Sequence, residues 1–244
     1  MRTCVIVPTY NNAATLPAVL EGVRRRGLPL IVVDDGSTDR TPSILASSEV
    51  DHVVTLKPNQ GKGFALCAGF EAALRLGFSR AITIDSDLQH DPRDIPRFME
   101  AARARPQALI VGVRRNLRAM GAPLANRFGN AASNLYFFLL TGRRLADTQS
   151  GYRSYPLGAT VALGCPPSRF EYEFVVLVAA ARSGLELASV PIKARYERDR
   201  YVSHFRPVKD FLRIFLAGLR AVRLPRHLSS RRALGFQLQK HRMR

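Results

Sequence analysis

Two carboxylates, Asp85 and Asp87, stand one residue apart directly after a short run of apolar and β-branched residues. Carboxylates with this spacing can share a hard divalent cation, and Mg²⁺ or Mn²⁺ held in this way often also contacts phosphate oxygens. Gln89 and His90 follow closely and could complete the set of ligands. The same stretch could instead be a polar turn in which Asp91 caps the next helix, so the spacing alone leaves both interpretations open.

A second acidic segment, Asp-Asp-Gly-Ser-Thr-Asp at 34–39, also follows an apolar run. An acid at the end of a strand can hydrogen-bond a ribose or the edge of a base, which makes Asp34 and Asp35 candidate nucleotide contacts. The alternative is a turn that caps a helix beginning near Thr41.

A glycine-rich segment, Asn-Gln-Gly-Lys-Gly at 59–63, precedes a helical pattern. It lacks the spacing of a P-loop. Its glycines still permit close approach of the backbone to a ligand, and Lys62 could meet a phosphate near the helix N-terminus. A glycine-rich turn with no ligand is the alternative.

The scaffold for these segments is predicted from alternating short apolar runs and helical patterns. Strands are expected at 4–7, 30–33, 52–56, 80–84 and 109–112, and helices at 16–25, 41–47, 63–76 and 92–105. This alternation is typical of βαβ units and a parallel sheet, so the expected fold class is α/β. Such sheets bind ligands at the carboxyl ends of their strands, where the polar segments fall.

The second half of the chain is less regular. Helices are expected at 119–140, 170–181 and 209–222, and a strand at 190–192, before a basic tail. A length of 244 residues suits one domain, or one domain with a short appendage. The three separated cysteines form neither a metal pattern nor a disulfide framework, which favours a reducing cytosol. The N-terminal apolar run is too short for a signal peptide, and we expect no membrane span.

The net charge of +18 is concentrated in the second half of the chain. Residues 1–110 contain 13 Lys and Arg against 12 Asp and Glu, whereas residues 111–244 contain 24 against 7. The second half should therefore attract polyanions, either a nucleic acid, an anionic membrane or a phosphorylated substrate. We expect no nucleic-acid partner, because no known nucleic-acid motif and no Trp for base stacking is present.

Taken in order, the polar segments resemble those of the inverting GT-A glycosyltransferases called family 2. The resemblance rests on 7–11 (Val-Pro-Thr-Tyr-Asn), 32–39, 59–63 and 85–90. Asp-Thr-Gln-Ser-Gly-Tyr-Arg at 147–153 further resembles the D-x-x-S-G-[FY]-R segment of the polyprenyl-phosphate branch, which includes dolichol-phosphate mannosyltransferases. Val-Pro-Ile at 190–192, followed by Arg198 and Ser203, is similar to that branch's V-P-I…R…S stretch. The resemblance covers roughly residues 3–205.

The resemblance implies a Rossmann-like GT-A domain at 1–205, with a mostly parallel sheet flanked by helices, followed by a basic amphipathic helix and tail at 206–244. It implies a nucleotide-sugar donor, GDP- or UDP-linked, and Mg²⁺ or Mn²⁺ held by Asp85, Asp87 and Gln89. The residues implied around the donor are Pro8, Tyr10, Asn12, Asp34, Asp35, Lys62, Asp85, Arg114 and Arg127. Those implied in the acceptor region are Ser150, Arg153, Ser203 and His204. The implied catalytic residues are Asp87, Asp147 and Arg198, with Arg198 on a mobile loop.

The sequence departs from the family pattern at two places, one in the first polar segment and one after the V-P-I stretch. Asn12 stands where the family often has an acid, and Tyr-Val-Ser-His at 201–204 replaces the branch's Gly-x-Ser-Lys. His204 is only partly charged near neutral pH, which weakens the phosphate contacts expected from that loop.

The expected reaction is a direct displacement at the anomeric carbon of the sugar, with inversion. A lipid-phosphate acceptor is already ionised at pH 7 and needs little help from a base. A hydroxyl acceptor on a glycan or lipid would need a carboxylate to take its proton, and Asp147 is the candidate. Alternatively, Asp147 pairs with Arg153 or caps a turn. A nucleotide-sugar-binding protein without catalysis is a further alternative, which the intact Asp85 and Asp87 pair disfavours.

The helix expected at 209–222 mixes apolar residues with Lys209, Arg213 and Arg220, and can lie in a membrane interface. An apolar patch at 135–140 could join it or belong to the core. We therefore expect a peripheral protein on the anionic, cytoplasmic face of a membrane. The alternative is a helix packed on the domain with its basic face in water.

Overall fold

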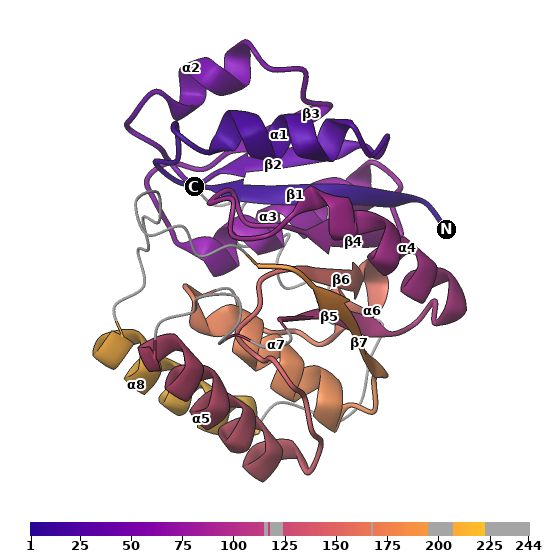
Figure 1. The fold of residues 1–244 in the computed structure, drawn as a ribbon, viewed down its shortest axis with the longest axis vertical. Helices are drawn as coiled ribbons and strands as arrows, with labels where there is room; N and C mark the ends of the chain where they lie inside the picture. The colour runs from indigo at the N-terminus through magenta and orange to yellow at the C-terminus, as the bar shows by residue number, and fades with distance from the viewer. Residues whose placement is uncertain (115–116, 118–123, 167, 195–206, 223–244) are drawn as a thin grey trace.

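The computed structural model describes residues 1–114, 117, 124–166, 168–194 and 207–222. A seven-stranded sheet runs through the molecule in the order β3-β2-β1-β4-β6-β5-β7 (Figure 1). The strands are β1 Thr3–Thr9, β2 Leu30–Asp34, β3 His52–Thr55, β4 Arg80–Thr83, β5 Leu109–Arg114, β6 Arg153–Pro156 and β7 Leu187–Ile192. All neighbouring pairs are parallel except those that β6 makes with β4 and β5. The expected α/β fold with a mostly parallel sheet is thus confirmed.

Helices cover both faces of this sheet. They are α1 Leu16–Arg24, α2 Thr41–Ala46, α3 Lys62–Arg75, α4 Ile95–Ala104, α5 Leu124–Thr141, α6 Leu157–Ala162, α7 Glu171–Arg182 and α8 Pro207–Ala221, with a 3₁₀ turn η1 at Pro92–Asp94. Successive side chains of β1 point to opposite faces. Cys4 and Ile6 join the core under α3 and α7, whereas Val5 and Val7 join the core under α1 and α4.

Strand β6 and helix α6 were not predicted from the sequence. Strand β6 has only four residues and contains both Arg153 and Pro156, so it shows neither an apolar run nor an alternating pattern. It enters the sheet between β4 and β5, where Arg153 pairs with Thr83 and Val111. Burial on both sides and a ladder with two neighbours make this segment a strand, and neither condition can be seen locally in the sequence.

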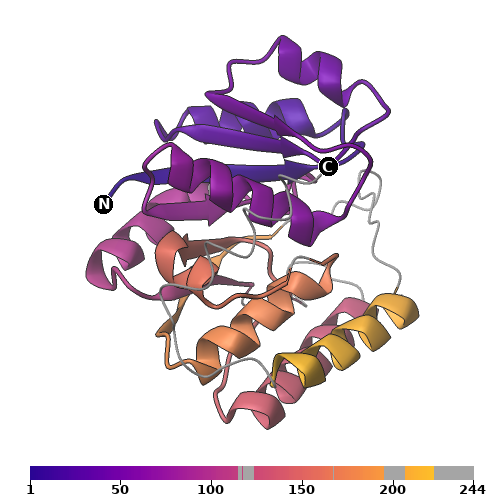
Figure 2. The same ribbon diagram turned by 180° about the vertical axis from the view of Figure 1, so that it is seen from behind.

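Helices α5 and α8 lie side by side at the end of the molecule opposite α2 (Figures 1 and 2). The ring of Tyr136 on α5 stacks on Phe174 of α7 and on Phe215 of α8, with centroids 5.5 and 4.9 Å apart. Gly218 on α8 makes this approach possible, because a Cβ there would lie 2.8 Å from the Tyr136 ring. The three helices therefore pack together through aromatic contacts.

The amphipathic helix α8 packs on the rest of the protein through one face. Ala221 is buried in the core under α3 and α7, with Ile214 and Ala217 packed against it. The patch at 135–140 is divided: Phe137 is fully buried, whereas Leu135 and Leu139 are exposed. Packing of α8 on the domain is thus present, the 135–140 patch is partly core, and membrane contact stays a prediction. No helix among the described residues is long and apolar enough to span a bilayer.

Candidate active site

The carboxyl ends of β1, β2 and β4 bring three polar loops to one edge of the sheet. The Asn11 side-chain oxygen accepts from the backbone N–H of Thr38 at 2.8 Å, which joins the first loop to the second. The Asn12 amide donates to the Ser86 hydroxyl at 2.7 Å, which joins the first loop to the Asp85–Asp87 segment. A cavity of about 250 Å³ opens between these loops, and its lining includes Asn12 and Asp87.

Asp34 and Asp35 are both buried, and their carboxylates hold neighbouring loops. Asp34 accepts from the backbone N–H of Ser37 at 3.0 Å. Asp35 accepts from the backbone N–H groups of Gln60 and Gly61 at 2.8 and 2.7 Å. Burial raises the pKa of the Asp35 carboxyl above its ordinary value, although those two N–H groups oppose the shift. Both acids thus shape this edge of the sheet, and their direct contact with a nucleotide stays a prediction.

Lys62, the first residue of α3, lies between two carboxylates. Its ammonium is 2.7 Å from Asp85 Oδ1 and 2.8 Å from Glu173 Oε2. Burial alone would lower the pKa of Lys62, but the two carboxylates outweigh burial and raise it above its ordinary value. Burial likewise disfavours the charge on Asp85, yet Lys62 leaves the Asp85 pKa below its ordinary value. The three side chains form a partly buried ion cluster at the site.

Asp87 differs from Asp85 in its surroundings. Burial, and then the neighbouring Asp85, raises the pKa of Asp87 to about 6. The backbone N–H of Gln89 donates to Asp87 Oδ1 at 2.9 Å, so Gln89 closes the turn after β4. His90 is buried beside this turn, and burial lowers its pKa to about 4. Its Nδ1 has no hydrogen-bond partner among the described residues. Asp91 caps η1 through the N–H of Arg93, so the cap and the carboxylate pair coexist.

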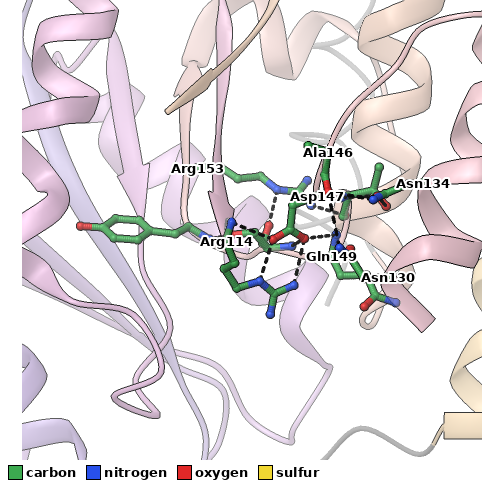
Figure 3. Close-up of polar contacts among 10 residues, drawn as sticks. Arg114, Asn130, Asn134, Ala146, Asp147, Gln149 and Arg153 are labelled. Carbon is green, nitrogen blue, oxygen red and sulfur yellow. Dashed lines mark hydrogen bonds and ion pairs between the residues drawn. The ribbon is translucent and has the colours of Figure 1, made fainter. Parts of the chain in front are cut away.

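Arg114, at the end of β5, forms a two-point ion pair with Asp147 (Figure 3). Arg114 Nε and Nη2 donate to the two carboxylate oxygens at 2.7 and 2.9 Å, and Asp147 is fully buried. Asp147 also accepts from the N–H groups of Gln149 and Ser150. The pairing of Asp147 with Arg153 considered from the sequence is therefore wrong, because Asp147 pairs with Arg114. The turn that Asp147 was expected to cap is present at Gln149 and Ser150.

Arg153 lies inside the domain and not on its surface. Its guanidinium donates to the carbonyl oxygens of Ser150, Thr148 and Glu173, at 2.7, 2.9 and 2.6 Å. Ser150 is buried as well. Arg153 and Ser150 hold the 147–153 loop against α7. Their buried side chains correct the expectation that they face the acceptor.

The same loop is fastened to α5 on its other side (Figure 3). Asn134 accepts from the backbone N–H of Thr148 at 2.9 Å and donates to the Ala146 carbonyl at 2.8 Å. The hydroxyls of Ser133 and Thr148 are 2.7 Å apart. The loop that carries Asp147 is thus fixed to the helix whose opposite face is exposed.

The remaining expected site residues fall on other elements or outside the described part of the chain. Pro8 is buried within β1, next to Val33 of β2, and Tyr10 follows it at the strand end. Arg127 lies on α5 and is partly exposed. Arg198, Ser203 and His204 lie outside the residues that the structure describes.

The structure adds functional candidates that the sequence analysis did not assign, chiefly Glu173 and Asn134. Glu173 directly precedes the apolar run 174–181 of α7, and an acid on such a buried helix was the available signal. Asn134 carried no local signal, because an Asn on a helix is ordinarily a surface residue.

Comparison with known proteins decides the family. Residues 4–153 match the family described as "Glycosyl transferase family 2". The chain belongs to glycosyl transferase family 2. The matched stretch contains the Asp85–Asp87 pair, Lys62, Arg114 and Asp147, and it ends within β6. The chain is accordingly a glycosyltransferase, as the resemblance implied.

Two relatives are similar to this chain over most of their own length. An undecaprenyl-phosphate mannosyltransferase of Micrococcus luteus is 30% identical over 204 residues, covering 79% of this chain and 83% of the relative.

 A UDP-N-acetylglucosamine–dolichyl-phosphate N-acetylglucosaminyltransferase of Methanococcus voltae is 30% identical over 213 residues, covering 79% of this chain and 85% of the relative. These similarities confirm the resemblance to the polyprenyl-phosphate branch of the family.

A solved structure supports the same fold. The crystal structure of mannosyl-3-phosphoglycerate synthase from Rubrobacter xylanophilus superposes with a TM-score of 0.65 at 16% identity, covering 91% of this chain and 73% of that one. At this identity the likeness concerns the fold alone. It agrees with the GT-A architecture expected from the sequence.

Proposed function

We propose that this glycosyltransferase moves a sugar from a GDP- or UDP-linked donor to a polyprenyl phosphate at a membrane surface, with inversion at the anomeric carbon. The observation that carries the proposal is the similarity to two relatives whose names specify an undecaprenyl-phosphate and a dolichyl-phosphate substrate. The cavity beside Asp87 supplies a place for the donor at the carboxyl edge of the sheet.

The proposal includes Mg²⁺ or Mn²⁺ held by Asp85 and Asp87, with Gln89 assisting. The described residues contain no group of three or more His, Cys, Asp or Glu that could hold a metal by themselves. This agrees with a cation held by one or two carboxylates together with phosphate oxygens of the donor, which is a common way of binding Mg²⁺. The raised pKa of Asp87 also fits, because a nearby cation would offset the cost of its buried charge.

In the proposed mechanism, negative charge grows on the departing nucleoside diphosphate as its bond to the anomeric carbon breaks. The divalent cation, when bound, supplies part of the positive charge that stabilises this leaving group. Lys62 supplies positive charge at the N-terminus of α3, beside Asp85. Arg114 is held by Asp147 at the end of β5 and is the second proposed cationic group. Arg127 is the third, and Pro8, Tyr10, Asn12, Asp34 and Asp35 are proposed to shape the nucleotide pocket.

The proposed acceptor, a lipid phosphate, attacks as an anion and requires no general base. This suits Asp147, whose two oxygens already accept hydrogen bonds from Arg114. Asp147 is therefore proposed to hold Arg114. Transfer to a hydroxyl remains the alternative, in which Asp147 would have to release Arg114 before accepting a proton. Arg198, Ser203 and His204 are proposed to contribute to the acceptor side.

Membrane contact is proposed through the outer faces of α5 and α8, on the cytoplasmic leaflet. Large apolar side chains are exposed along both helices: Leu124, Phe128, Leu135, Leu139, Phe215, Leu216 and Leu219. Arg213 and Arg220 are exposed on the same helix α8. An apolar face bordered by cations favours an anionic bilayer over a neutral one.

The experiment that tests the function is transfer of labelled sugars from a panel of GDP- and UDP-sugars to undecaprenyl phosphate, with undecaprenol as the matched hydroxyl acceptor. We expect product with the phosphate only, and only when Mg²⁺ or Mn²⁺ is present. Transfer to undecaprenol alone would support the hydroxyl alternative. Binding of donor without transfer to either lipid would contradict the proposed reaction.

A further inference from the structure

Glu173 is a buried acid with one oxygen engaged by Lys62. It lies in the first turn of α7, is 7% exposed, and its Oε2 is 2.8 Å from Lys62 Nζ. Its other oxygen, Oε1, has no hydrogen-bond partner within the described part of the chain. A buried carboxylate is costly unless it is paired, so its retention beside Lys62 requires an explanation.

The packing around Lys62 leaves its ammonium little freedom. The N-termini of α3 and α7 meet closely, because a Cβ at Gly63 would overlap the carbonyl oxygen of Ser168. On the other side, a Cβ at Gly151 would overlap a carboxylate oxygen of Asp85 and lie 2.7 Å from Lys62 Nζ. Two glycines thus make room for the cluster. A cation at a helix N-terminus is disfavoured by the helix dipole, so Lys62 depends on its two carboxylates.

Lys62 and a divalent cation would compete for the same carboxylate. Asp85 Oδ1 is 2.7 Å from Lys62 Nζ, and Asp85 is also a proposed metal ligand. Glu173, whose Oε2 is 2.8 Å from the same ammonium, shares it with Asp85 and balances its charge. With that carboxylate neutral, the ammonium would interact more strongly with Asp85 and oppose binding of another cation there.

We propose that Glu173 is a positioning residue: it holds Lys62 and thereby leaves Asp85 able to share a divalent cation with Asp87. This inference rests on the proposed metal site. It assigns to α7 a part in tuning that site, through Lys62 and without contact to the metal itself.

The test measures Mn²⁺ binding by electron paramagnetic resonance, in the presence of UDP and, separately, GDP, for the full chain. Glu173→Gln is compared with Glu171→Gln, which removes the same charge from the same turn of α7. We expect the Mn²⁺ dissociation constant to rise about tenfold in Glu173→Gln, as for loss of a group that orients a metal ligand. Glu171→Gln should change it by no more than about twofold.

A double substitution separates positioning from a general structural role. In a Lys62→Met background, Glu173→Gln should leave Mn²⁺ affinity unchanged, because no ammonium remains to be held. If Lys62→Met does not fold, Glu173→Asp serves instead, and it should recover part of the affinity lost in Glu173→Gln. Equal Mn²⁺ affinity of wild type and Glu173→Gln would overturn the inference alone. Absence of Mn²⁺ binding by the wild type with either nucleotide would overturn the metal assignment as well.

Discussion

Asp85 and Asp87 stand one residue apart, yet their surroundings shift their pKa values in opposite directions. Burial disfavours the charge of both carboxylates, but Lys62 at 2.7 Å leaves the pKa of Asp85 below its ordinary value. For Asp87, burial and the charge of Asp85 raise the pKa to about 6. Asp87 is therefore the carboxylate of the pair whose charge would gain most from an added cation.

At this residue scale, we expect Asp87→Ala to lower the rate of sugar transfer by at least about 100-fold, because charge on the leaving group loses its stabilisation. The fold should persist, since the substitution removes a buried charge with a raised pKa. The measurements are transfer of labelled sugar and thermal unfolding of the same preparation. Wild-type turnover in a folded variant would contradict the metal assignment.

A second residue-scale prediction concerns the buried pair Arg114 and Asp147. Asp147→Ala should lower the free energy of unfolding by about 3 kcal/mol or more, because it leaves a buried guanidinium without its carboxylate. The matched control is Glu186→Ala, which breaks the exposed pair with Arg105 and should cost less than about 1 kcal/mol. Urea unfolding of both variants checks the difference. A similar decrease in the free energy of unfolding for both variants would show that the buried Arg114 to Asp147 pair contributes no more than an exposed pair.

At the scale of elements, the close contact between the N-termini of α3 and α7 brings Lys62 to Glu173. The backbone N–H of Gly63 donates to the Arg169 carbonyl at 3.2 Å, and Gly63 offers no side chain to separate the two segments. A helix that begins next to another helix can therefore contribute to the same ion cluster, although more than 100 residues separate Lys62 and Glu173 in the chain.

Gly63→Ala should accordingly destabilise the protein by about 1 to 3 kcal/mol, because its methyl group overlaps backbone atoms of the Ser168 segment. Gly158→Ala on α6 is the control, since nothing lies within 4 Å of its added methyl group. That control should be neutral or slightly stabilising, as Ala favours helix over Gly. Thermal unfolding of the two variants measures the contrast, and equal stability would argue against tight packing of α3 on α7.

At the scale of the whole molecule, α5 and α8 form one end (Figures 1 and 2). Most of the large apolar side chains that are exposed in the described part of the chain lie on these two helices. The inner face of α5 hydrogen-bonds the loop that carries Asp147, through Asn134. The outer face exposes Leu135 and Leu139. One helix thus connects the proposed membrane side with the proposed acceptor side, which would bring a lipid phosphate toward the site.

We expect Leu135→Ser/Leu139→Ser to reduce recovery with vesicles of phosphatidylglycerol by about tenfold or more, because two large side chains lose burial in the bilayer. Leu76→Ser, at the C-terminal end of α3, removes a comparably exposed Leu from another part of the molecule and serves as the control. Cosedimentation at low and high salt is the measurement.

A variant with neutral residues in place of Lys209, Arg213, Arg220 and Arg223 should also be recovered less with these vesicles. The loss should be strongest at low salt, where charge attraction is least screened. Equal recovery of that variant and the wild type would count against an anionic membrane partner.

The sequence by itself determined the α/β class, the order of most strands and helices, and the segments that bear the chemistry. Periodic apolar patterns and polar residues at strand ends are local signals, and Asp85, Asp87 and Lys62 could be singled out from them. Their order along the chain was sufficient to indicate family 2, which the match over 4–153 established.

The tertiary structure alone decided which charges meet. Strand β6, the Arg114 to Asp147 pair, the inward position of Arg153 and the place of Glu173 beside Lys62 all depend on segments far apart in sequence. Asp147 was considered as a partner of Arg153, six residues away, whereas its partner lies 33 residues earlier on β5. Burial and ion pairing are properties of the packed molecule, since desolvation and distance set their strength and neither is written in local sequence.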